Sequence, residues 1–321
     1  MKAVTVLAAL AAAVFGAAAP AQQYPSRPIA MIVPFPPGGI ADITGRPLAV
    51  AMAKTLGQTI VVENKSGAGG AVGHAYVAKA KADGYTIMTA LSSIVVIPEA
   101  DKVNGRPSTY QMSEFAPIAL VSADPMLLLV PADAPWRTLK ELVDDARSRP
   151  GKISYASSGV YGTAHTCFEM LAQAANVKLL HVPYKGGGPA MTALLAGETN
   201  LGAQSPCVSN PHLKSGKVRV LGSWGASRTA ALPDVPTMKE QGFDVEFYIW
   251  AGVFAPAGLP PDVAARLRAS VRQAVQDPEF RNAMAGINTP INFLEGAEFD
   301  RFLDTDTKRL AAVVQKMGRT E

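Results

Sequence analysis

The chain has 321 residues, of which 48% are hydrophobic and 17% are charged. Its length suits two domains of ordinary size, and the low charge without long runs of one sign excludes a disordered or coiled-coil protein. The formal net charge is +4, but the Lys and Arg residues are scattered and form no basic stripe with aromatic residues between them. We therefore expect no nucleic-acid partner, and a mild positive field that attracts acidic small molecules.

Residues 1–21 have the pattern of a cleaved secretory signal. Lys2 is followed by an apolar run from Ala3 to Ala19 and then by Pro20 and Ala21. A basic start, an apolar centre and an A-x-A site are the three parts of such a signal. The run is slightly shorter than a membrane-spanning helix and no Cys follows it, so we expect export without a membrane or lipid anchor.

The first element of the mature chain is a strand followed by a glycine turn and a helix. The apolar run Ile29–Val33 ends at prolines, which cannot donate to a sheet ladder. The turn P-F-P-P-G-G at 34–39 leaves main-chain N–H groups uncovered at its two glycines. Asp42 and Thr44 are candidate N-caps of the helix. Free N–H groups and a helix dipole favour an anion here, although an ordinary strand-to-helix turn explains the segment equally well.

The rest of the chain alternates short apolar strands with helical patterns. Further strands are predicted at 59–63, 86–90, 118–122, 126–130, 153–156, 179–183, 201–204, 218–224 and 247–255. Helices are predicted at 42–56, 71–81, 139–149, 163–175, 189–195, 208–215, 236–241, 261–275, 278–285 and 297–314. This alternation predicts an α/β fold with mostly parallel sheets and right-handed crossovers, whose ligands bind at the carboxyl ends of the strands.

Small polar residues follow several of these strands. They are Ser92 and Ser93, then Ser157, Ser158, Gly159 and Thr163, then Tyr184-Lys185-Gly186-Gly187-Gly188, and finally Ser205. Loops that offer hydroxyls and bare amides suit a small polar ligand in a cleft between two domains. Ser and Gly are also common in loops without a function.

Two other patterns are weaker. The segment G-A-G-G-A-V-G at 67–73 resembles a dinucleotide-binding turn, but Val72 stands where the third glycine belongs and no acidic residue follows at the required distance. Ser157 or Ser158 near His165 suggests a nucleophile and a base, but no acid is placed to orient the histidine. We expect no catalytic residue.

The cysteines and histidines give no metal signature. The chain has only two cysteines, Cys167 and Cys207, and the sequence leaves open whether they form a disulfide or remain buried thiols. The four histidines are scattered and none has the spacing of a metal-binding pair. We therefore expect neither a metal site nor a cofactor.

Seven motifs follow one another in one order along nearly the whole mature chain. They are P-F-P-P-G-G-x-x-D at 34–42, L-G-Q-x-I-V-V-E-N-K-S-G-A-G-G at 56–70, A-D-G-Y-T at 82–86, P-G-K-I-S-Y-A-S-S-G at 150–159, H-V-P-Y-K-G at 181–186, L-P-D-V-P-T at 232–237 and F-A-P-A-G at 254–258. This set resembles the Bug-type solute receptors of tripartite tricarboxylate transporters. The resemblance implies a type II periplasmic binding protein, in which two α/β lobes joined by a hinge close an interlobe cleft on a small carboxylate.

The resemblance also implies a site in which main-chain amides and ordered water grip one carboxylate. The residues that match the family site are Pro37, Gly38, Gly39 and Asp42, with Ser158, Gly159, Thr163 and His165 opposite. The far end of the ligand is expected to meet Ser92, Ser93, Gln204, Ser205, Tyr248 and Trp250. Amino-acid-binding relatives often have an Asp in the loop that holds Gln204, so a ligand without an ammonium group is favoured. Tyr248 and Trp250 keep an aromatic acid open beside a di- or tricarboxylate.

The lobes are expected to be discontinuous, with lobe 1 formed by 24–122 plus 225–321, lobe 2 by 123–224, and the two crossovers as the hinge. The expected protein is a periplasmic monomer that passes its ligand to the membrane subunits of a transporter and performs no chemistry. Two other functions stay open: a sensory receptor that presents a bound carboxylate to a membrane kinase, and a Ser/His hydrolase. If amides hold the anion, no site group titrates near neutral pH, because a helix-start position disfavours charged His165.

Overall fold

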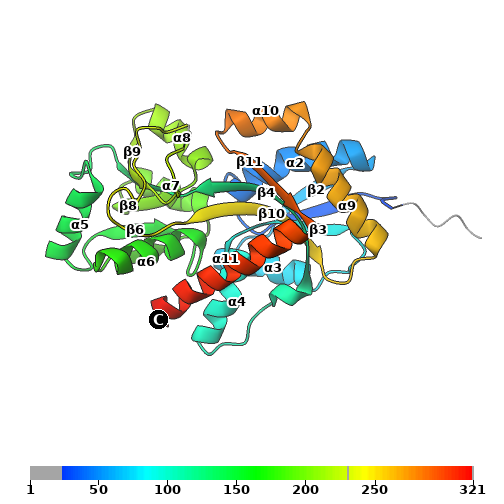
Figure 1. Ribbon diagram of the computed structural model, residues 1–321, viewed down its shortest axis with the longest axis horizontal. Coiled ribbons are helices and arrows are strands. Elements are labelled where there is room, and N and C mark those ends of the chain that lie inside the picture. Colours follow the sequence, from blue (N-terminus) through cyan, green and yellow to red (C-terminus); the bar gives the residue numbers. More distant parts are fainter. Residues whose placement is uncertain (1–23, 230, 320–321) are drawn as a thin grey trace, which may run out of the picture.

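Two sheets, each covered by helices, make up the molecule (Figure 1). The computed structural model describes residues 24–229 and 231–319, so the predicted signal at 1–21 lies outside the described residues. Lobe 1 is built on a six-stranded sheet with the order β11-β4-β10-β3-β1-β2, and lobe 2 on a five-stranded sheet with the order β7-β6-β8-β5-β9. The predicted division into two α/β lobes is confirmed. In the described part of the chain no helix is both long and apolar enough to cross a membrane.

The strands of lobe 1 come from both ends of the chain, whereas those of lobe 2 are continuous in sequence. Lobe 1 contains β1 (Ile29–Val33), β2 (Ile60–Asn64), β3 (Thr86–Leu91), β4 (Phe115–Pro125), β10 (Tyr248–Pro256) and β11 (Ile291–Glu295). Lobe 2 contains β5 (Leu127–Pro131), β6 (Ser154–Ser157), β7 (Leu180–Pro183), β8 (Leu201–Gln204) and β9 (Val218–Ser223).

The helices lie on both sides of the two sheets. In lobe 1 they are α2 (Ile40–Leu56), α3 (Ala71–Ala78), α4 (Ser93–Val103), α9 (Pro261–Ala274), α10 (Pro278–Gly286) and α11 (Gly296–Met317), with short 3₁₀ turns η1 (Ala68–Gly70) and η2 (Met112–Glu114). In lobe 2 they are α5 (Leu139–Ser148), α6 (Thr163–Ala175), α7 (Gly187–Leu195) and α8 (Pro206–Lys214).

The prediction of mostly parallel sheets is wrong. The parallel pairs are β1 with β2 and β3, and β6 with β7 and β8, whereas β10 with β3 and β4, β4 with β11, and β5 with β8 and β9 are antiparallel. The antiparallel pairs arise because the strands next to the crossovers between the lobes run back along their sheets. A buried strand is equally apolar in either direction, so periodicity does not reveal this.

Four local predictions also need correction. Residues 93–103, for which no helix was predicted, form α4, and residues 236–241, predicted as a helix, form a turn. The edge strand β11 was not predicted because it is only partly buried and shows little alternation. Helix α2 begins before Asp42 and Thr44, with Gly39 as its N-cap and no side-chain cap.

Cys167 and Cys207 are both buried free thiols, so the disulfide that the sequence left open is absent.

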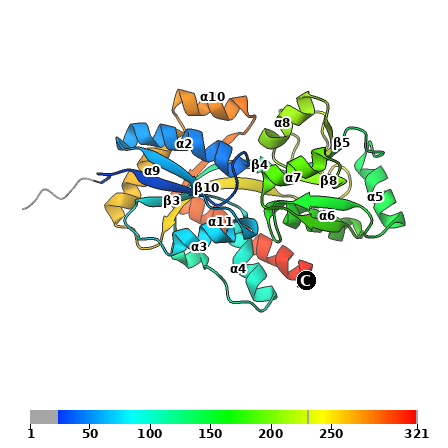
Figure 2. The same ribbon diagram turned by 180° about the vertical axis from the view of Figure 1, so that it is seen from behind.

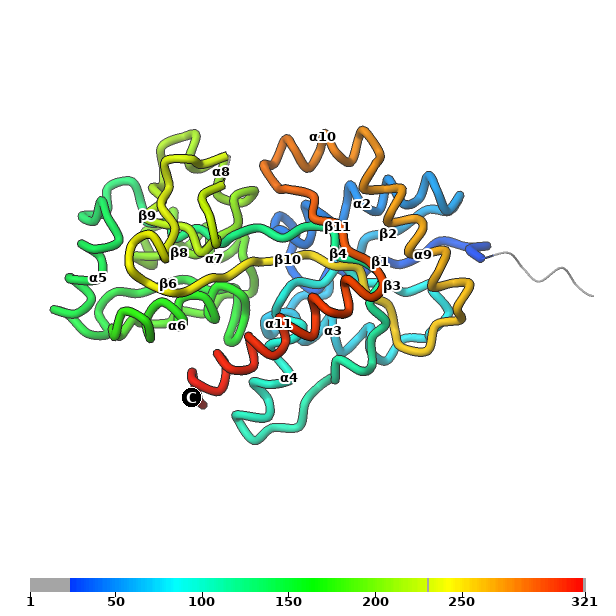
Figure 3. Tube along the Cα trace, viewed as in Figure 1, coloured from blue at the N-terminus to red at the C-terminus, as the bar shows by residue number. Residues whose placement is uncertain are grey.

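The long strands β4 and β10 run side by side from lobe 1 toward lobe 2 (Figure 3). The chain passes from β4 to β5 at Met126 and returns from β9 to β10. In the β4–β10 register Asp124 lies opposite Ile249, so these two side chains share one face of the ribbon. The neighbouring Trp250 points to the other face, where α11 packs, because successive residues of a strand alternate.

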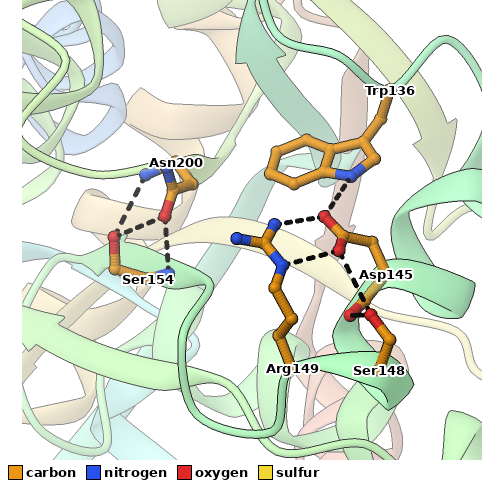
Figure 4. Close-up of polar contacts among 6 residues, drawn as sticks. All are labelled: Trp136, Asp145, Ser148, Arg149, Ser154 and Asn200. Atoms are coloured by element: carbon orange, nitrogen blue, oxygen red, sulfur yellow. Dashed lines mark hydrogen bonds and ion pairs between the residues drawn. The ribbon is translucent and has the colours of Figure 1, made fainter.

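Polar contacts fix the position of β6, whose end leads into the site (Figure 4). The main-chain N–H and hydroxyl of Ser154 donate to Asn200 Oδ1 at 2.9 and 3.1 Å, which ties the start of β6 to the residue before β8. In the preceding helix α5, Asp145 accepts hydrogen bonds from Trp136 Nε1 at 2.9 Å and from Arg149 Nε at 2.7 Å. Strand β6 is therefore anchored at its first residue, and the residue after its end, Ser158, lies between the lobes.

Candidate functional site

A cavity lies between the lobes at the ends of β1, β6 and β8. The space within it that the centre of a water molecule can reach is about 30 Å³. Lobe 1 and the β4–β10 ribbon contribute Phe35, Gly39, Ile40, Ala41, Leu91, Met126 and Ile249, and lobe 2 contributes Ser158, Thr163, Ala164, Gly187, Ala203, Gln204, Ser205 and Val208. Only this small space remains between the lobes, so they lie close together. None of these lining residues carries a charge.

Four helices begin at this cavity. The first residues of α2 and α6, and Gly187 at the start of α7, line it, as does Ser205, which precedes α8. In none of the four does the N-cap side chain accept a hydrogen bond from the helix start, and three of the N-caps are glycines, which have no side chain to accept one. The first N–H groups of a helix have no partner within it, and the helix dipole places positive potential there. Their convergence makes an anion site without a cationic side chain.

Ser158 adds a hydroxyl that has no partner in the described structure. Its Oγ is buried and makes no hydrogen bond with residues 24–229 or 231–319, while the side chain is 8% exposed and lines the cavity. A buried hydroxyl without a partner is costly unless a ligand or water satisfies it. In the same lobe, Gln204 Nε2 donates to the main-chain carbonyl of Gly187 at 2.9 Å. This hydrogen bond ties the Gln204 side chain to the start of α7. Both side chains are predicted site residues, and the structure brings them to one cavity.

The glycine turn is held in shape by Asp42. Gly38 has a φ of +83°, which favours glycine, and its N–H donates to Asp42 Oδ2 at 3.1 Å. Burial alone would raise the pKa of Asp42, but hydrogen bonds from Arg46, Asn64 and the Gly38 amide outweigh it and lower the pKa. Asp42 therefore stays ionised and positions the turn, while Gly38 and Asp42 themselves do not line the cavity.

A stacked pair of histidines supports the loop that carries Ser158. The rings of His165 and His181 lie 3.9 Å apart at an interplanar angle of 6°. His165 Nδ1 accepts from the N–H of Tyr161 at 2.8 Å, and His181 Nε2 lies 2.6 Å from Ser157 Oγ. Burial, and then the neighbouring ring, lower the pKa of His165 to about 3, and burial lowers the pKa of His181 to about 4. Both are neutral near pH 7, as expected for His165.

The Ser157–His181 contact does not make a hydrolase site. Ser157 is fully buried and does not line the cavity, and its hydroxyl is also bonded to the main chain of Gly159. His165 does not line the cavity either. The pair therefore positions the loop between β6 and α6.

Glycines bring the two lobes into contact on either side of the cavity. A Cβ on Gly159 would lie 2.9 Å from the main-chain nitrogen of Gly69, and one on Gly186 would lie 2.6 Å from Pro36 Cδ. Both distances are shorter than real Cβ contacts. Figure 2 shows α2 and α7, which follow Pro36 and Gly186, facing one another across the middle of the molecule. The close approach of the lobes therefore depends on residues without side chains.

Four further predicted residues do not line the cavity. Ser92 precedes α4 and has a buried Oγ without a partner among the described residues, and Ser93 donates to the carbonyl of Gly69 at 2.9 Å. Pro37 is exposed at the rim. Gly159 lines a second interlobe cleft, on the far side of its contact with Gly69.

Tyr248 and Trp250 do not lie in this cavity. Trp250 is fully buried in the core of lobe 1 and donates through Nε1 to Asp306 Oδ2 at 2.7 Å. Tyr248 accepts from the N–H of Ala226 at 2.8 Å through its hydroxyl. Ile249, between them, points into the cavity instead. The prediction placed both side chains at the ligand, but successive residues of a strand point to opposite faces, and here Ile249 takes the cavity side.

Sequence reasoning missed two groups of lining residues. Three consecutive glycines, at 186–188, mark the start of α7 in the sequence, but Gly187 was not predicted as a site residue. The apolar wall of Phe35, Met126 and Ile249 has no signal that separates it from ordinary core. Among the described residues, no cluster of three His, Cys, Asp or Glu side chains suits a metal ion.

Comparison with known proteins identifies relatives along nearly the whole chain. The model of the tripartite tricarboxylate transporter family receptor matches residues 44–319. A UPF0065 protein from the tcbD-tcbE intergenic region of Pseudomonas sp. strain P51 is 39% identical, and the match covers 88% of this chain and 86% of that protein. Protein BugT of Bordetella pertussis is 34% identical, with 94% of each chain covered.

Solved structures agree in fold and sequence. The periplasmic binding protein BugD is 35% identical with a TM-score of 0.85, and the match covers 91% of this chain and 98% of BugD. MatC of Rhodopseudomonas palustris, solved with malate, is 29% identical with a TM-score of 0.83 and covers 91% and 100%. Rpa4515 of the same organism, solved with adipate, is 28% identical with a TM-score of 0.84 and covers 91% and 98%.

Proposed function

Because the chain belongs to the Bug-type receptors of the tripartite tricarboxylate transporter family, we propose that its interlobe cavity captures a small dicarboxylate. Solute-binding proteins of this family hold their ligand and release it unchanged. The observation that carries the proposal is the convergence of four uncapped helix starts and the Ser158 hydroxyl on one cavity without charged side chains. An anion satisfies all of these donors at once.

The strength of such a site follows from its donors. A hydrogen bond to a charged group contributes about 1.5–3 kcal/mol. Four such bonds contribute about 6–12 kcal/mol, which brackets the roughly 8 kcal/mol of micromolar binding. An ammonium group would lie among N–H donors and the amide of Gln204, so amino acids are disfavoured. The malate and adipate held by two structural relatives support an aliphatic dicarboxylate, and the absence of Tyr248 and Trp250 from the cavity removes the reason for an aromatic one.

The proposal also includes the lobe boundaries, the cellular location and the transport partner of the protein. We place the hinge at the two crossovers, with lobe 1 near residues 24–122 plus 225–321 and lobe 2 near 123–224. The signal pattern of residues 1–21 supports a periplasmic location, where a monomeric receptor would pass its ligand to the membrane subunits of a transporter.

A thermal-shift screen against organic acids tests this function. A dicarboxylate at 100 times its Kd should stabilise the protein by about 2.7 kcal/mol. Ser158→Ala should weaken binding of malate or adipate by a factor of about 10 to 150, because one charged hydrogen bond is lost. Ser215→Ala, on an exposed turn of lobe 2, is the matched control and should bind like the unmodified protein. A screen without any shift, or full affinity in Ser158→Ala, would contradict the proposal.

A further inference from the structure

The hinge ribbon carries a buried carboxyl group that the site described above does not use. Asp124, near the end of β4, is completely buried, and neither of its side-chain oxygens has a hydrogen-bond partner in residues 24–229 or 231–319. It lies opposite Ile249 in the ribbon and two residues before Met126, both of which line the ligand cavity. Its side chain therefore lies on the face of the β4–β10 ribbon that also carries Ile249.

Both lobes contribute to the burial of Asp124. It lines a second cleft, of about 640 Å³, between α8 of lobe 2 and α10 of lobe 1, which flank the gap at the top of Figure 1. From lobe 2 come Pro206 and Cys207, and burial together with the nearby Asp124 raises the pKa of the Cys207 thiol to about 11. From lobe 1 comes Thr289, which is buried and lies beside Cys207.

The charged and titratable groups around Asp124 do not compensate a negative charge. Helix α8 presents Cys207 and no cation, and the segment after β9 presents Thr229 and Ala231. Helix α10 presents Arg281, which contacts Gln276 at 3.4 Å and makes no ion pair with Asp124. The paired strand β10 presents apolar Ile249. Burial without a partner disfavours the ionised form and raises the pKa of Asp124 well above its ordinary value.

Building on the proposed function, we propose that Asp124 is a proton-binding site of the closed receptor, so that capture of a dicarboxylate takes up one proton. In the separated lobes Asp124 faces water and is ionised at neutral pH, since an ordinary Asp has a pKa of about 3.9. Closure removes that water and brings a dianion to the same face of the ribbon, and both changes favour the protonated acid. The receptor therefore binds more tightly as pH falls.

Calorimetric titration with adipate and with malate, in HEPES and in Tris, measures this proton. The two buffers differ in ionisation enthalpy, so the difference in binding heat counts the protons taken up. The unmodified protein should take up about one proton per dicarboxylate at pH 7, and Kd should rise by up to about tenfold for each pH unit between pH 6 and 8. Asp124→Asn keeps the shape of the side chain and should show no uptake and a nearly constant Kd.

Asp101→Asn is the matched control, because Asp101 lines the other interlobe cleft and pairs with Arg106 at 3.6 Å. It should retain the proton uptake. Binding without proton uptake in the unmodified protein would overturn this inference and leave the proposed function intact, as would equal uptake in Asp124→Asn. An absence of binding heat with every acid in a wider screen would overturn both. The measurement on the unmodified protein does not depend on how well any variant folds.

Discussion

Replacing Gly159 by Ala separates the cost of folding from the cost of closing the lobes. Gly159 has a φ of +131°, which an L residue rarely adopts, and this strain of about 1–3 kcal/mol belongs to lobe 2 whether the lobes are open or closed. The clash is different, because the new Cβ would lie 2.9 Å from the nitrogen of Gly69 in the other lobe only after closure. The lobes must then separate by about 0.5 Å to reach an ordinary contact, which removes hydrogen bonds to the ligand.

We therefore expect Gly159→Ala to lower Tm by about 2–8 °C and to weaken adipate or malate binding at least about tenfold. Calorimetry gives the affinity, and small-angle scattering with saturating ligand shows whether the lobes still close. Gly197→Ala is the control: its φ is +74° and nothing lies within 4 Å of its Cβ, so Tm should fall while Kd stays the same. Normal affinity in Gly159→Ala would refute the argument that this contact forms part of the closed state.

Two further predictions concern the site. Gly39→Val should fold, because the nearest atom to its Cβ is Pro36 O at 3.9 Å, but its side chain should enter the small cavity and weaken dicarboxylate binding at least about tenfold by calorimetry. The histidine pair predicts a fall in the free energy of unfolding as pH drops from about 6.5 to 4. The pKa of each ring is lowered on folding, so the unfolded chain binds the protons first as the pH falls. The free energy of unfolding therefore drops by up to about 1.4 kcal/mol per pH unit for one buried ring. Urea melts across this range that show no slope would contradict the neutral pair.

The sequence predicted the elements better than their arrangement. Apolar runs and turn residues placed β1, β8 and α6 within a residue, because local patterns decide where such elements begin and end. The strand directions were missed, since they depend on which crossover returns between the lobes. In the site, Gly39, Ser158 and Gln204 were predicted and line the cavity.

Asp124 shows the limit of sequence reasoning most clearly. An acid before a proline near the end of an apolar strand reads as an exposed turn residue. The structure buries it, because β4 continues past this point into the hinge and elements from both lobes cover it. The prediction that no group near the ligand titrates close to neutral pH was built on the local surroundings of His165. It does not take account of a carboxyl that only the fold brings to the hinge.

The charges enclosed on closure connect amide recognition with the proton on Asp124. Each helix start carries about half a positive charge, so the four starts at the cavity supply about two, which balances a dicarboxylate. No lining residue adds a cation, and an ionised Asp124 would bring a third negative charge against the same ribbon. A proton on Asp124 removes that excess without a new side chain. A fully ionised tricarboxylate carries one negative charge more than the roughly two positive charges that the four helix starts supply. The closed cavity should therefore select dicarboxylates over tricarboxylates of similar size.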